Sequence, residues 1–314
     1  MATTYSTVVA PDSRTPTDAS VLHAMQTARS LGLNVTLKPQ VDVNTGSWRG
    51  AINPADPSAW FTSYQAMIDH YAGLAQQGGA DMLVIGTEFG SMTGGANTSR
   101  WQQIIAGIRQ RFGGRLTYAA NFDEFWRVGF WRSLDYIGVD AYFPLSSTGG
   151  GSASDLVSAW TARGWVNALR STSLAVGKPV LFTEIGYRSL AGSTIHPNIW
   201  SSSGSYDMAE QQNANEAAYE VFAGQPWFAG IYWWSWPATL PANGWNSDYT
   251  PSEDVMRSWN ARLARMSGTT PPPDGVSKPA PPAAPTPPHK AKKHKKRHVA
   301  KRKHRRAKKH RRHA

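Results

Sequence analysis

The sequence of 314 residues contains no cysteine, which excludes disulfide bonds, thiolate catalysis and zinc–thiolate sites. Long apolar segments are lacking too: none approaches the roughly 18 residues that a transmembrane helix needs. Residues 1–5 show neither the basic region nor the apolar segment of a signal peptide. Before residue 289 the only histidines are His23, His70 and His196, and their spacing matches no metal site. We therefore expect neither a metal nor another cofactor.

Acidic residues are absent from residues 289–314, which carry 15 of the 33 lysines and arginines. The preceding residues hold the other 18 basic residues and all 21 acidic ones, a formal charge of −3 within a chain of +12. The sequence thus predicts a mildly acidic globular domain over 1–268, a stiff proline-rich linker over 269–288 and a disordered Lys/Arg/His-rich tail over 289–314.

The tail is expected to bind polyanions by counterion release, without sequence preference. Nucleic acid, anionic membrane and anionic cell-wall polymers are the candidates. No aromatic residue lies between the charges to stack on bases. The alternative is a solvated tail with no specific partner.

Strand, loop and helix alternate along residues 1–268, which is typical of parallel strands joined by crossover helices. Short apolar segments predict strands at 6–9, 34–37, 82–88, 116–121, 136–142, 179–184 and 228–236. No glycine-rich phosphate loop follows an early strand, which argues against a doubly wound sheet. Functional-looking residues instead stand at the strand exits: Asp42, Glu88, Asn121, Asp140, Glu184 and Trp234. This distribution predicts an α/β fold of the (β/α)8 TIM-barrel type, with its site at the C-terminal ends of the strands.

Only seven strand–helix units are found, so we expect the barrel to lack its first unit in this chain. The gap would leave two unpaired strand edges, which are a liability. Either another segment closes it or the natural protein has an upstream piece. One helix is expected between the loop at 146–153 and about Arg170, and the loop at 188–205 is a candidate lid or subsite wall.

Two of the predicted strands end in glutamate, at Glu88 and Glu184. A carboxylate at the exit of an apolar strand is costly to desolvate, so a pair of them suggests two groups acting across a sugar bond. Each could instead cap a helix or pair with an arginine. The 14 tryptophans suit sugar stacking, although most could belong to the core.

Motifs at the strand exits occur in a characteristic order. They are 37–39 with 41–42, 48–50, 60–61 with Tyr64, 85–88, 117–121, 130–131 with 134–142, 177–179, 182–187 and 233–234. In this order the chain, over about residues 8–265, resembles glycoside hydrolase family 113, a retaining (β/α)8 family of clan A that includes β-mannanases.

The resemblance implies that Glu88, on the fourth strand of the full barrel, is the general acid/base and that Glu184, on the seventh, is the nucleophile. Retaining chemistry then requires their carboxyl groups to lie about 5–5.5 Å apart. The substrate-binding residues implied are Lys38, Asp42, Trp48, Arg49, Asn121, Asp140, Tyr142, Tyr187 and Trp234.

Several of these residues have specific expected roles. Tyr142 is a candidate donor to Glu184, and Trp234 is a candidate platform under the sugar. Trp48 and Arg49 are candidates for a distal subsite. Lys38 could instead form a salt bridge with Asp42 that shapes the floor of the site. Strand-end capping is the alternative for Asn121 and Asp140.

Two positions depart from the pattern that the resemblance leads us to expect. Gln40 stands where a histidine is expected, and Thr87 stands where many clan A enzymes place asparagine before the acid/base. The contact to the sugar 2-hydroxyl must then be made elsewhere.

The leading function is hydrolysis of a β-linked polysaccharide, first of all by an endo-β-1,4-mannanase. The alternatives are a clan A hydrolase acting on another β-glycan or cell-wall polymer, and a non-catalytic carbohydrate-binding or wall-associated barrel protein. A nucleic-acid protein would be supported by the tail alone. We expect a monomer that is extracellular or attached to the cell envelope.

Overall fold

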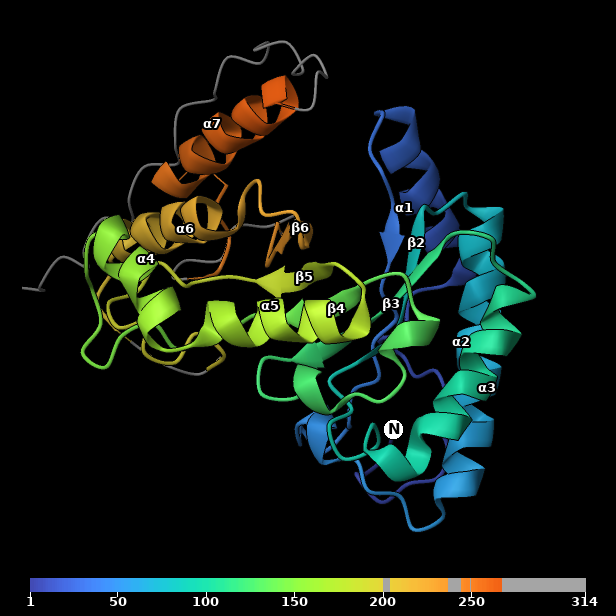
Figure 1. Cartoon of the computed structure of the whole chain (residues 1–314). Helices are drawn as coiled ribbons and strands as arrows, with labels where there is room; N and C mark the ends of the chain where they lie inside the picture. Colours follow the sequence, from blue (N-terminus) through green and yellow to red (C-terminus); the bar gives the residue numbers. More distant parts are fainter. Residues whose placement is uncertain (200–203, 237–243, 249, 267–314) are drawn as a thin grey trace, which may run out of the picture. The chain divides into compact units, whose positions relative to one another are not determined.

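The computed structural model describes residues 1–199, 204–236, 244–248 and 250–266, all within the compact unit Met1–Pro273. The predictions for the linker and the tail lie outside these residues. Six strands form one parallel sheet in sequence order (Figure 1): β1 Thr36–Leu37, β2 Met82–Thr87, β3 Arg115–Asn121, β4 Ile137–Asp140, β5 Val180–Ile185 and β6 Phe228–Trp233. The helices are α1 Asp18–Ser30, α2 Pro57–Gln77, α3 Thr98–Arg109, α4 Ala153–Ala162, α5 Trp165–Val176, α6 Met208–Phe222 and α7 Pro251–Met266.

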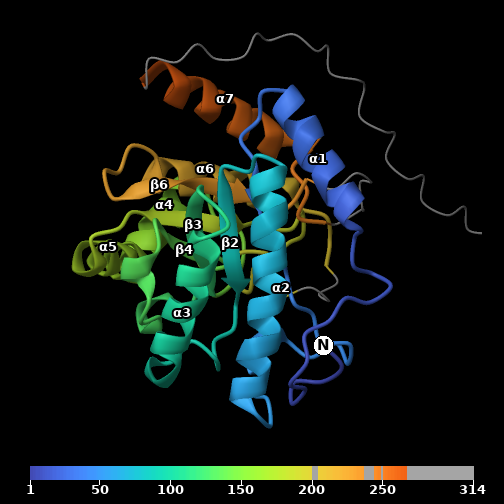
Figure 2. The same cartoon turned by 90° about the vertical axis from the view of Figure 1, so that its right-hand side faces the viewer.

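The sheet curls, and its helices lie outside it, so the described residues form a partial (β/α) barrel (Figures 1 and 2). Strands β2 and β5 are buried along their whole length, which explains why their sequences are continuously apolar rather than alternating. Helices α2 and α3 pack side by side over β2 and β3 (Figure 2). The predicted fold class is confirmed.

The strand register brings polar residues from neighbouring strands to the same end of the sheet. Asn121 is the register partner of Asp140, and Asp140 is the partner of Glu184. Because parallel strands end at one edge, residues far apart in sequence meet there without any further folding of loops. The C-terminal edge of the sheet therefore carries the cluster of polar residues.

The predicted strand at 6–9 is wrong, because this segment pairs with a helix and not with a sheet neighbour. The Val9 backbone N–H donates to Ser63 Oγ at 2.8 Å, and Ser63 Oγ donates to the Val9 carbonyl at 3.2 Å. One side chain of α2 thus satisfies both backbone groups that a strand ladder would use. The strand expected at 34–37 is also shorter, and comprises only Thr36–Leu37.

The two outer strands of the sheet meet through side chains. Thr36 Oγ1 of β1 lies 2.6 Å from Tyr232 Oη of β6, within hydrogen-bond distance. Among the described residues no strand pairs with the free edge of either one. The curl is thus closed at this point by a side-chain hydrogen bond and not by a backbone ladder.

Two helices occupy the stretch where the sequence predicts one. Helix α4 begins with a capping box at Ser152 and Asp155. It ends before Gly164, whose φ of 80° is left-handed, and α5 begins at the next residue. A left-handed residue cannot continue a right-handed helix, so the single helix expected to reach Arg170 is wrong at this point.

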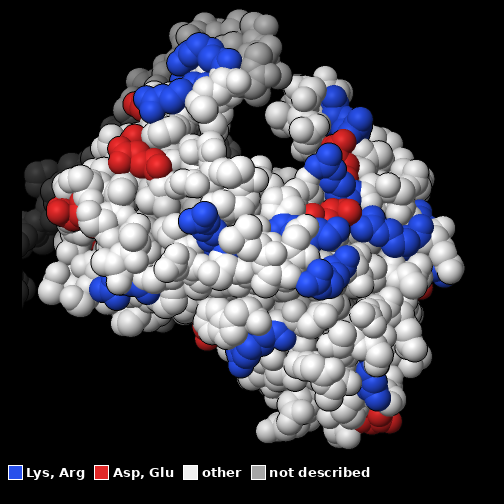
Figure 3. All heavy atoms as spheres, viewed as in Figure 1, with Lys and Arg blue, Asp and Glu red and all other residues white. Residues whose placement is uncertain are grey.

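Many of the tryptophans belong to the core. Trp60, Trp101, Trp131 and Trp160 are buried, and Trp60 stacks on Tyr64 with ring centroids 4.9 Å apart. Basic and acidic side chains are interspersed on the face shown in Figure 3 and are not gathered into a single patch of either sign. No helix among the described residues has the length and apolarity needed to span a bilayer.

Candidate active site

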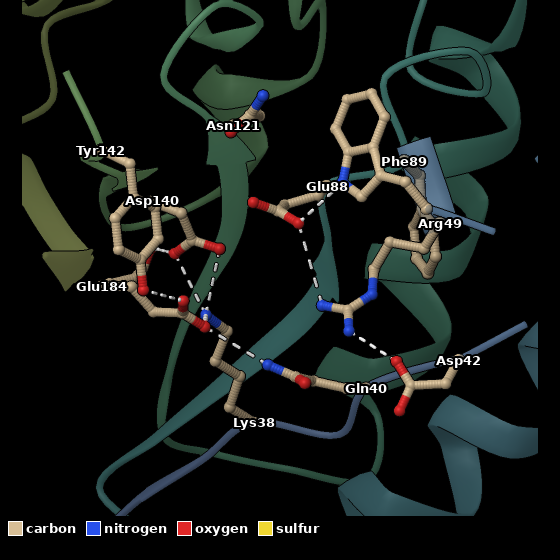
Figure 4. Close-up of polar contacts among 12 residues, drawn as sticks. Lys38, Gln40, Asp42, Arg49, Glu88, Phe89, Asn121, Asp140, Tyr142 and Glu184 are labelled. Atoms are coloured by element: carbon tan, nitrogen blue, oxygen red, sulfur yellow. Dashed lines mark hydrogen bonds and ion pairs between the residues drawn. The ribbon is translucent and has the colours of Figure 1, made fainter. Parts of the chain in front are cut away.

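A cavity of about 690 Å³ opens at the C-terminal end of the strands. Two glutamates line it: Glu88, directly after β2, and Glu184, in β5. Their side chains extend into the cavity from opposite sides (Figure 4). Eight of the eleven predicted site residues line this cavity: Asp42, Trp48, Arg49, Glu88, Asn121, Tyr142, Glu184 and Trp234.

Three donors surround the carboxylate of Glu184. Lys38 Nζ lies 2.5 Å from Oε1, and Gln40 Nε2 donates to the same oxygen at 3.3 Å. Tyr142 Oη donates to Oε2 at 2.8 Å, the contact that the sequence predicts. These three contacts fix the Glu184 carboxylate at the cavity wall.

Lys38 also pairs with Asp140 below the cavity. Its Nζ lies 3.0 and 3.2 Å from the two carboxylate oxygens, and Thr183 Oγ1 donates to Asp140 Oδ1 at 2.7 Å. Burial raises the pKa of Asp140 to about 8, against the opposing charge of Lys38. Burial alone would lower the pKa of Lys38, but the charges of Asp140 and Glu184 outweigh it and raise that pKa. Lys38 is therefore the cation shared by two buried acids.

The expected salt bridge between Lys38 and Asp42 does not form. Asp42 instead accepts from Arg49 Nη2 at 2.5 Å, and its side chain is 60% exposed. An exposed carboxylate is already solvated by water, whereas Asp140 and Glu184 are not, so the ammonium of Lys38 is stabilised more by the buried pair.

Glu88 lies in a different environment. Its backbone φ is +53°, a left-handed conformation that costs a non-glycine residue about 1–2 kcal/mol. Trp48 Nε1 donates to Oε2 at 3.1 Å, and Arg49 Nη1 lies 3.9 Å from the same oxygen. Burial raises the pKa of Glu88 and the nearby charge of Glu184 adds to this, although Trp48 and Arg49 act in the opposite direction. Glu88 is thus the carboxyl group of the pair that holds a proton more readily than in water.

Replacing Trp48 with phenylalanine is expected to raise the pKa of Glu88 further. The indole N–H stabilises the ionised carboxylate, and its loss favours the protonated form. With Glu88 as the general acid that the resemblance implies, retention of its proton to higher pH should move the alkaline limb of a kcat/KM profile to higher pH, which a pH series normalised to its own maximum will measure. An unchanged or lowered alkaline limb would show that Glu88 does not control that limb.

Three predicted site residues do not line the cavity. Lys38 and Asp140 act on it through Glu184, and Asp140 is fully buried. Tyr187 is buried in the core, and its hydroxyl has no hydrogen-bond partner among the described residues. Asn121 does line the cavity, where its amide donates to Asp123 Oδ1 at 2.8 Å. The side chains of Asn121 and Asp140 thus bond to other side chains at the strand ends.

The sequence interpretation missed several residues at or near the cavity. Arg14, Asp123, Asn198 and Trp245 line it. Glu124 is 1% exposed and accepts from the backbone N–H of Asn121, which lines the cavity. None of them stands at the end of an apolar strand, so the strand-exit pattern gave no signal for them. No group of His, Asp and Glu in the described part of the chain has the arrangement needed to hold a metal ion.

The chain is similar to known proteins in both sequence and structure. The model of Glycoside Hydrolase Family 113 matches residues 1–251. The structure of the GH113 β-mannanase AaManA from Alicyclobacillus acidocaldarius, in complex with ManMIm, is similar at a TM-score of 0.74 and 29% identity, over 83% of this chain and 84% of that one. A GH113 β-1,4-mannanase structure matches at a TM-score of 0.74 and 27% identity, over 82% of this chain and 84% of that one.

More distant structures share the fold alone. A β-glucuronidase from Ruminococcus gnavus has a TM-score of 0.56 and 13% identity, over 76% of this chain and 42% of that one. The search of curated proteins gave no match. The family match covers most of the chain, and it agrees with two glutamates that face one cavity at the C-terminal edge of a partial barrel. The chain belongs to Glycoside Hydrolase Family 113 and is a glycoside hydrolase.

Proposed function

We propose that the protein is a retaining endo-β-1,4-mannanase in which Glu88 is the general acid/base and Glu184 the nucleophile. The observation that carries the proposal is the contrast between the two carboxyl groups of one cavity. Lys38 and Tyr142 hold the Glu184 carboxylate by direct contacts, whereas burial raises the pKa of Glu88. A retaining glycosidase needs one ionised and one protonated carboxyl group. The similar β-mannanases supply the substrate class.

The reaction proceeds in two displacements. A Glu184 carboxylate oxygen attacks the anomeric carbon, the glycosidic C–O bond breaks, and Glu88 gives its proton to the leaving oxygen. Glu88 then accepts a proton from water as that water attacks the anomeric carbon, and the bond to Glu184 breaks. Both glutamates return to their starting protonation states, so no other proton donor is needed.

The remaining cavity residues hold the glycan. Trp48 is 52% exposed and Trp234 lines the same cavity, so both offer aromatic faces to sugar rings. The Arg49–Asp42 pair stands beside Trp48 and forms the wall of a distal subsite. Because Thr87 is buried, it does not reach the substrate. The hydrogen bond to the sugar 2-hydroxyl then comes from Gln40 or Asn121, which both line the cavity.

A substrate panel tests this function. Reducing-sugar release is measured on β-mannan, glucomannan, xylan and β-glucan with the full chain. We expect release from mannan and glucomannan, with internal cleavage seen as a rapid fall in viscosity. Release mainly from another glycan would favour the alternative clan A specificity. No release from any substrate by a folded chain that still binds glycan would favour a non-catalytic carbohydrate-binding protein.

Replacing Glu88 with glutamine is expected to lower kcat on β-mannan by about 10²- to 10⁴-fold, the usual contribution of a general acid/base. A mannoside with a good leaving group, such as 2,4-dinitrophenolate, needs no proton, so its first step should be nearly unchanged. Burst-phase release of the phenol measures that step directly. An equal loss on both substrates would count against Glu88 as the acid.

The stereochemistry of the product tests the double displacement independently of any variant. Two successive inversions at the anomeric carbon should give the β-anomer first, which proton NMR detects before mutarotation. Initial appearance of the α-anomer would instead indicate a single displacement by water, and Glu184 would then be a general base.

We also propose that residues 289–314 retain the enzyme on an anionic cell envelope. The 15 basic residues without an acid carry this proposal. Wall teichoic acid should retain the full chain at low salt and release it steeply as salt rises. A chain ending at residue 288 should not bind, and its hydrolysis of soluble mannan should match that of the full chain. Equal binding of the two chains would remove the tail from this role.

A further inference from the structure

Glu124 is a buried carboxylate that the proposed mechanism leaves without a role. It directly precedes the 3-10 helix Phe125–Arg127 and is 1% exposed. Burial raises its pKa, and the charge of Glu88 adds to this. Three donors satisfy it: Thr93 Oγ1 at 2.6 Å and Tyr118 Oη at 2.9 Å reach Oε1, and the Asn121 N–H reaches Oε2 at 3.1 Å.

The hydroxyl of Tyr118 connects this carboxylate to the backbone beside Glu88. It donates to Glu124 and accepts from the Phe89 N–H at 2.5 Å. Phe89 directly follows Glu88, whose own N–H donates to the Ala119 carbonyl at 2.8 Å. The left-handed residue Glu88 is therefore held on both sides by hydrogen bonds to β3, one to its backbone and one to the Tyr118 side chain.

We propose that Glu124, acting through Tyr118, is a positioning residue that holds the left-handed turn at Glu88 and so aims the proton of Glu88 at the leaving oxygen. The carboxylate orients the tyrosine hydroxyl, because a hydroxyl that donates to Glu124 has its lone pairs free to accept from Phe89. The proposal rests on the proposed role of Glu88 as the acid. Neither Glu124 nor Tyr118 lines the cavity, so neither touches substrate.

Glutamine at position 124 cannot reproduce this arrangement. If its oxygen faces Tyr118 and Thr93, its amide N–H₂ faces the N–H of Asn121, and two donors oppose each other. If its oxygen faces Asn121, its amide must donate to Tyr118, and the hydroxyl then has to turn its own proton elsewhere. The first orientation thus drives the side chain away from the Asn121 N–H, and the second removes the acceptor of the Tyr118 hydroxyl proton.

The test uses the full chain with Tyr118→Phe, Glu124→Gln and Thr93→Val. Kinetics are measured on β-mannan and on the first step of a 2,4-dinitrophenyl mannoside. We expect Tyr118→Phe and Glu124→Gln to lower kcat on mannan by about 10- to 100-fold with little change in KM, since a misplacement near 1 Å has effects of that size. Thr93→Val removes one donor and should lose less. The first step with the dinitrophenyl substrate should stay within about threefold of the parent.

Tyr64→Phe is the matched control. This substitution also removes a buried tyrosine hydroxyl, which donates to the Ile85 carbonyl at 2.6 Å. The Tyr64 hydroxyl forms no hydrogen bond with the Phe89 N–H or with Glu124. The substitution should lower the unfolding temperature without separating the two substrates. Equal losses on both substrates, or none on either, in the folded Tyr118→Phe and Glu124→Gln variants would overturn the inference. If Glu88→Gln still separates the substrates, only the inference fails; if it does not, the proposed role of Glu88 fails as well.

Discussion

Replacing Glu184 with glutamine is expected to lower kcat/KM on β-mannan by about 10⁴- to 10⁶-fold, the range found when a nucleophile or its partner is removed. An uncharged amide does not attack the anomeric carbon. The substitution preserves shape, and its carbonyl can still accept from Lys38 or Tyr142, so the fold should be kept. Reducing-sugar assays together with thermal unfolding measure both effects.

Glu220→Gln provides the control, because Glu220 is an exposed residue of α6 and its change should leave activity unaltered. Azide added to Glu184→Ala supplies a further check, since a small nucleophile can occupy the space of the missing carboxylate. The expected product is the α-mannosyl azide, formed by a single inversion. Activity of Glu184→Gln within tenfold of the parent would contradict its assignment as the nucleophile.

Replacing Lys38 with methionine is expected to destabilise the protein by about 3–5 kcal/mol, because it removes the shared cation and leaves buried carboxyl groups without it. Lys38 Nζ lies within 3.2 Å of Asp140 and Glu184. Asp140 is fully buried, and no other cation among the described residues forms an ion pair with it. Chemical denaturation measures the change, and mannan hydrolysis should fall as well because Glu184 loses the ammonium group that holds its carboxylate in place.

The destabilisation by Lys38→Met should depend on pH. Asp140 has a raised pKa of about 8, so at pH near 5 it is protonated with or without Lys38. As pH rises through about 8, Asp140 ionises in the parent beside Lys38, whereas in the variant the same ionisation has no partner. The free-energy difference between parent and variant should therefore grow from pH 5 to pH 9, and a constant difference would contradict the shared-cation role.

Lys178→Met is the matched control for this experiment. Lys178 lies just before β5, at the end of the strand opposite Glu184, and forms no ion pair with a described residue. The same change of side chain should then shift stability by no more than about 0.5 kcal/mol, as is usual for a residue without specific contacts. A similar loss in both variants would mean that the effect of Lys38→Met does not come from its ion pairs.

The sequence by itself determined where most strands lie and which glutamates end them. β2 and β5 are buried on both faces, and burial on both faces requires an unbroken apolar segment that is visible locally. The parallel arrangement then placed Glu88 and Glu184 at one edge, because all strands of such a sheet end on the same side. The contact between Tyr142 and Glu184 was predicted from the family resemblance, and Tyr142 lies two residues beyond Asp140, the register partner of Glu184.

Local sequence failed where the outcome depended on a partner. Residues 6–9 have the composition of a strand, but a strand exists only beside another, and Ser63 of α2 took both backbone hydrogen bonds of Val9. Gly164 separates α4 from α5 because its backbone is left-handed, and this conformation is set by the folded chain and not by the local sequence. Glu124 gave no signal, since it follows a loop residue and not an apolar strand.

Only the tertiary structure decided how the charges of the site are paired. Asp42 is four residues from Lys38, yet Lys38 pairs with Asp140, 102 residues away, and with Glu184, 146 residues away. Nearness along the chain favours the first pair, but the interaction of an ammonium with a carboxylate strengthens as both lose contact with water. Burial is a property of the curled sheet and not of any segment, so the network around Glu184 could be established only once the sheet had formed.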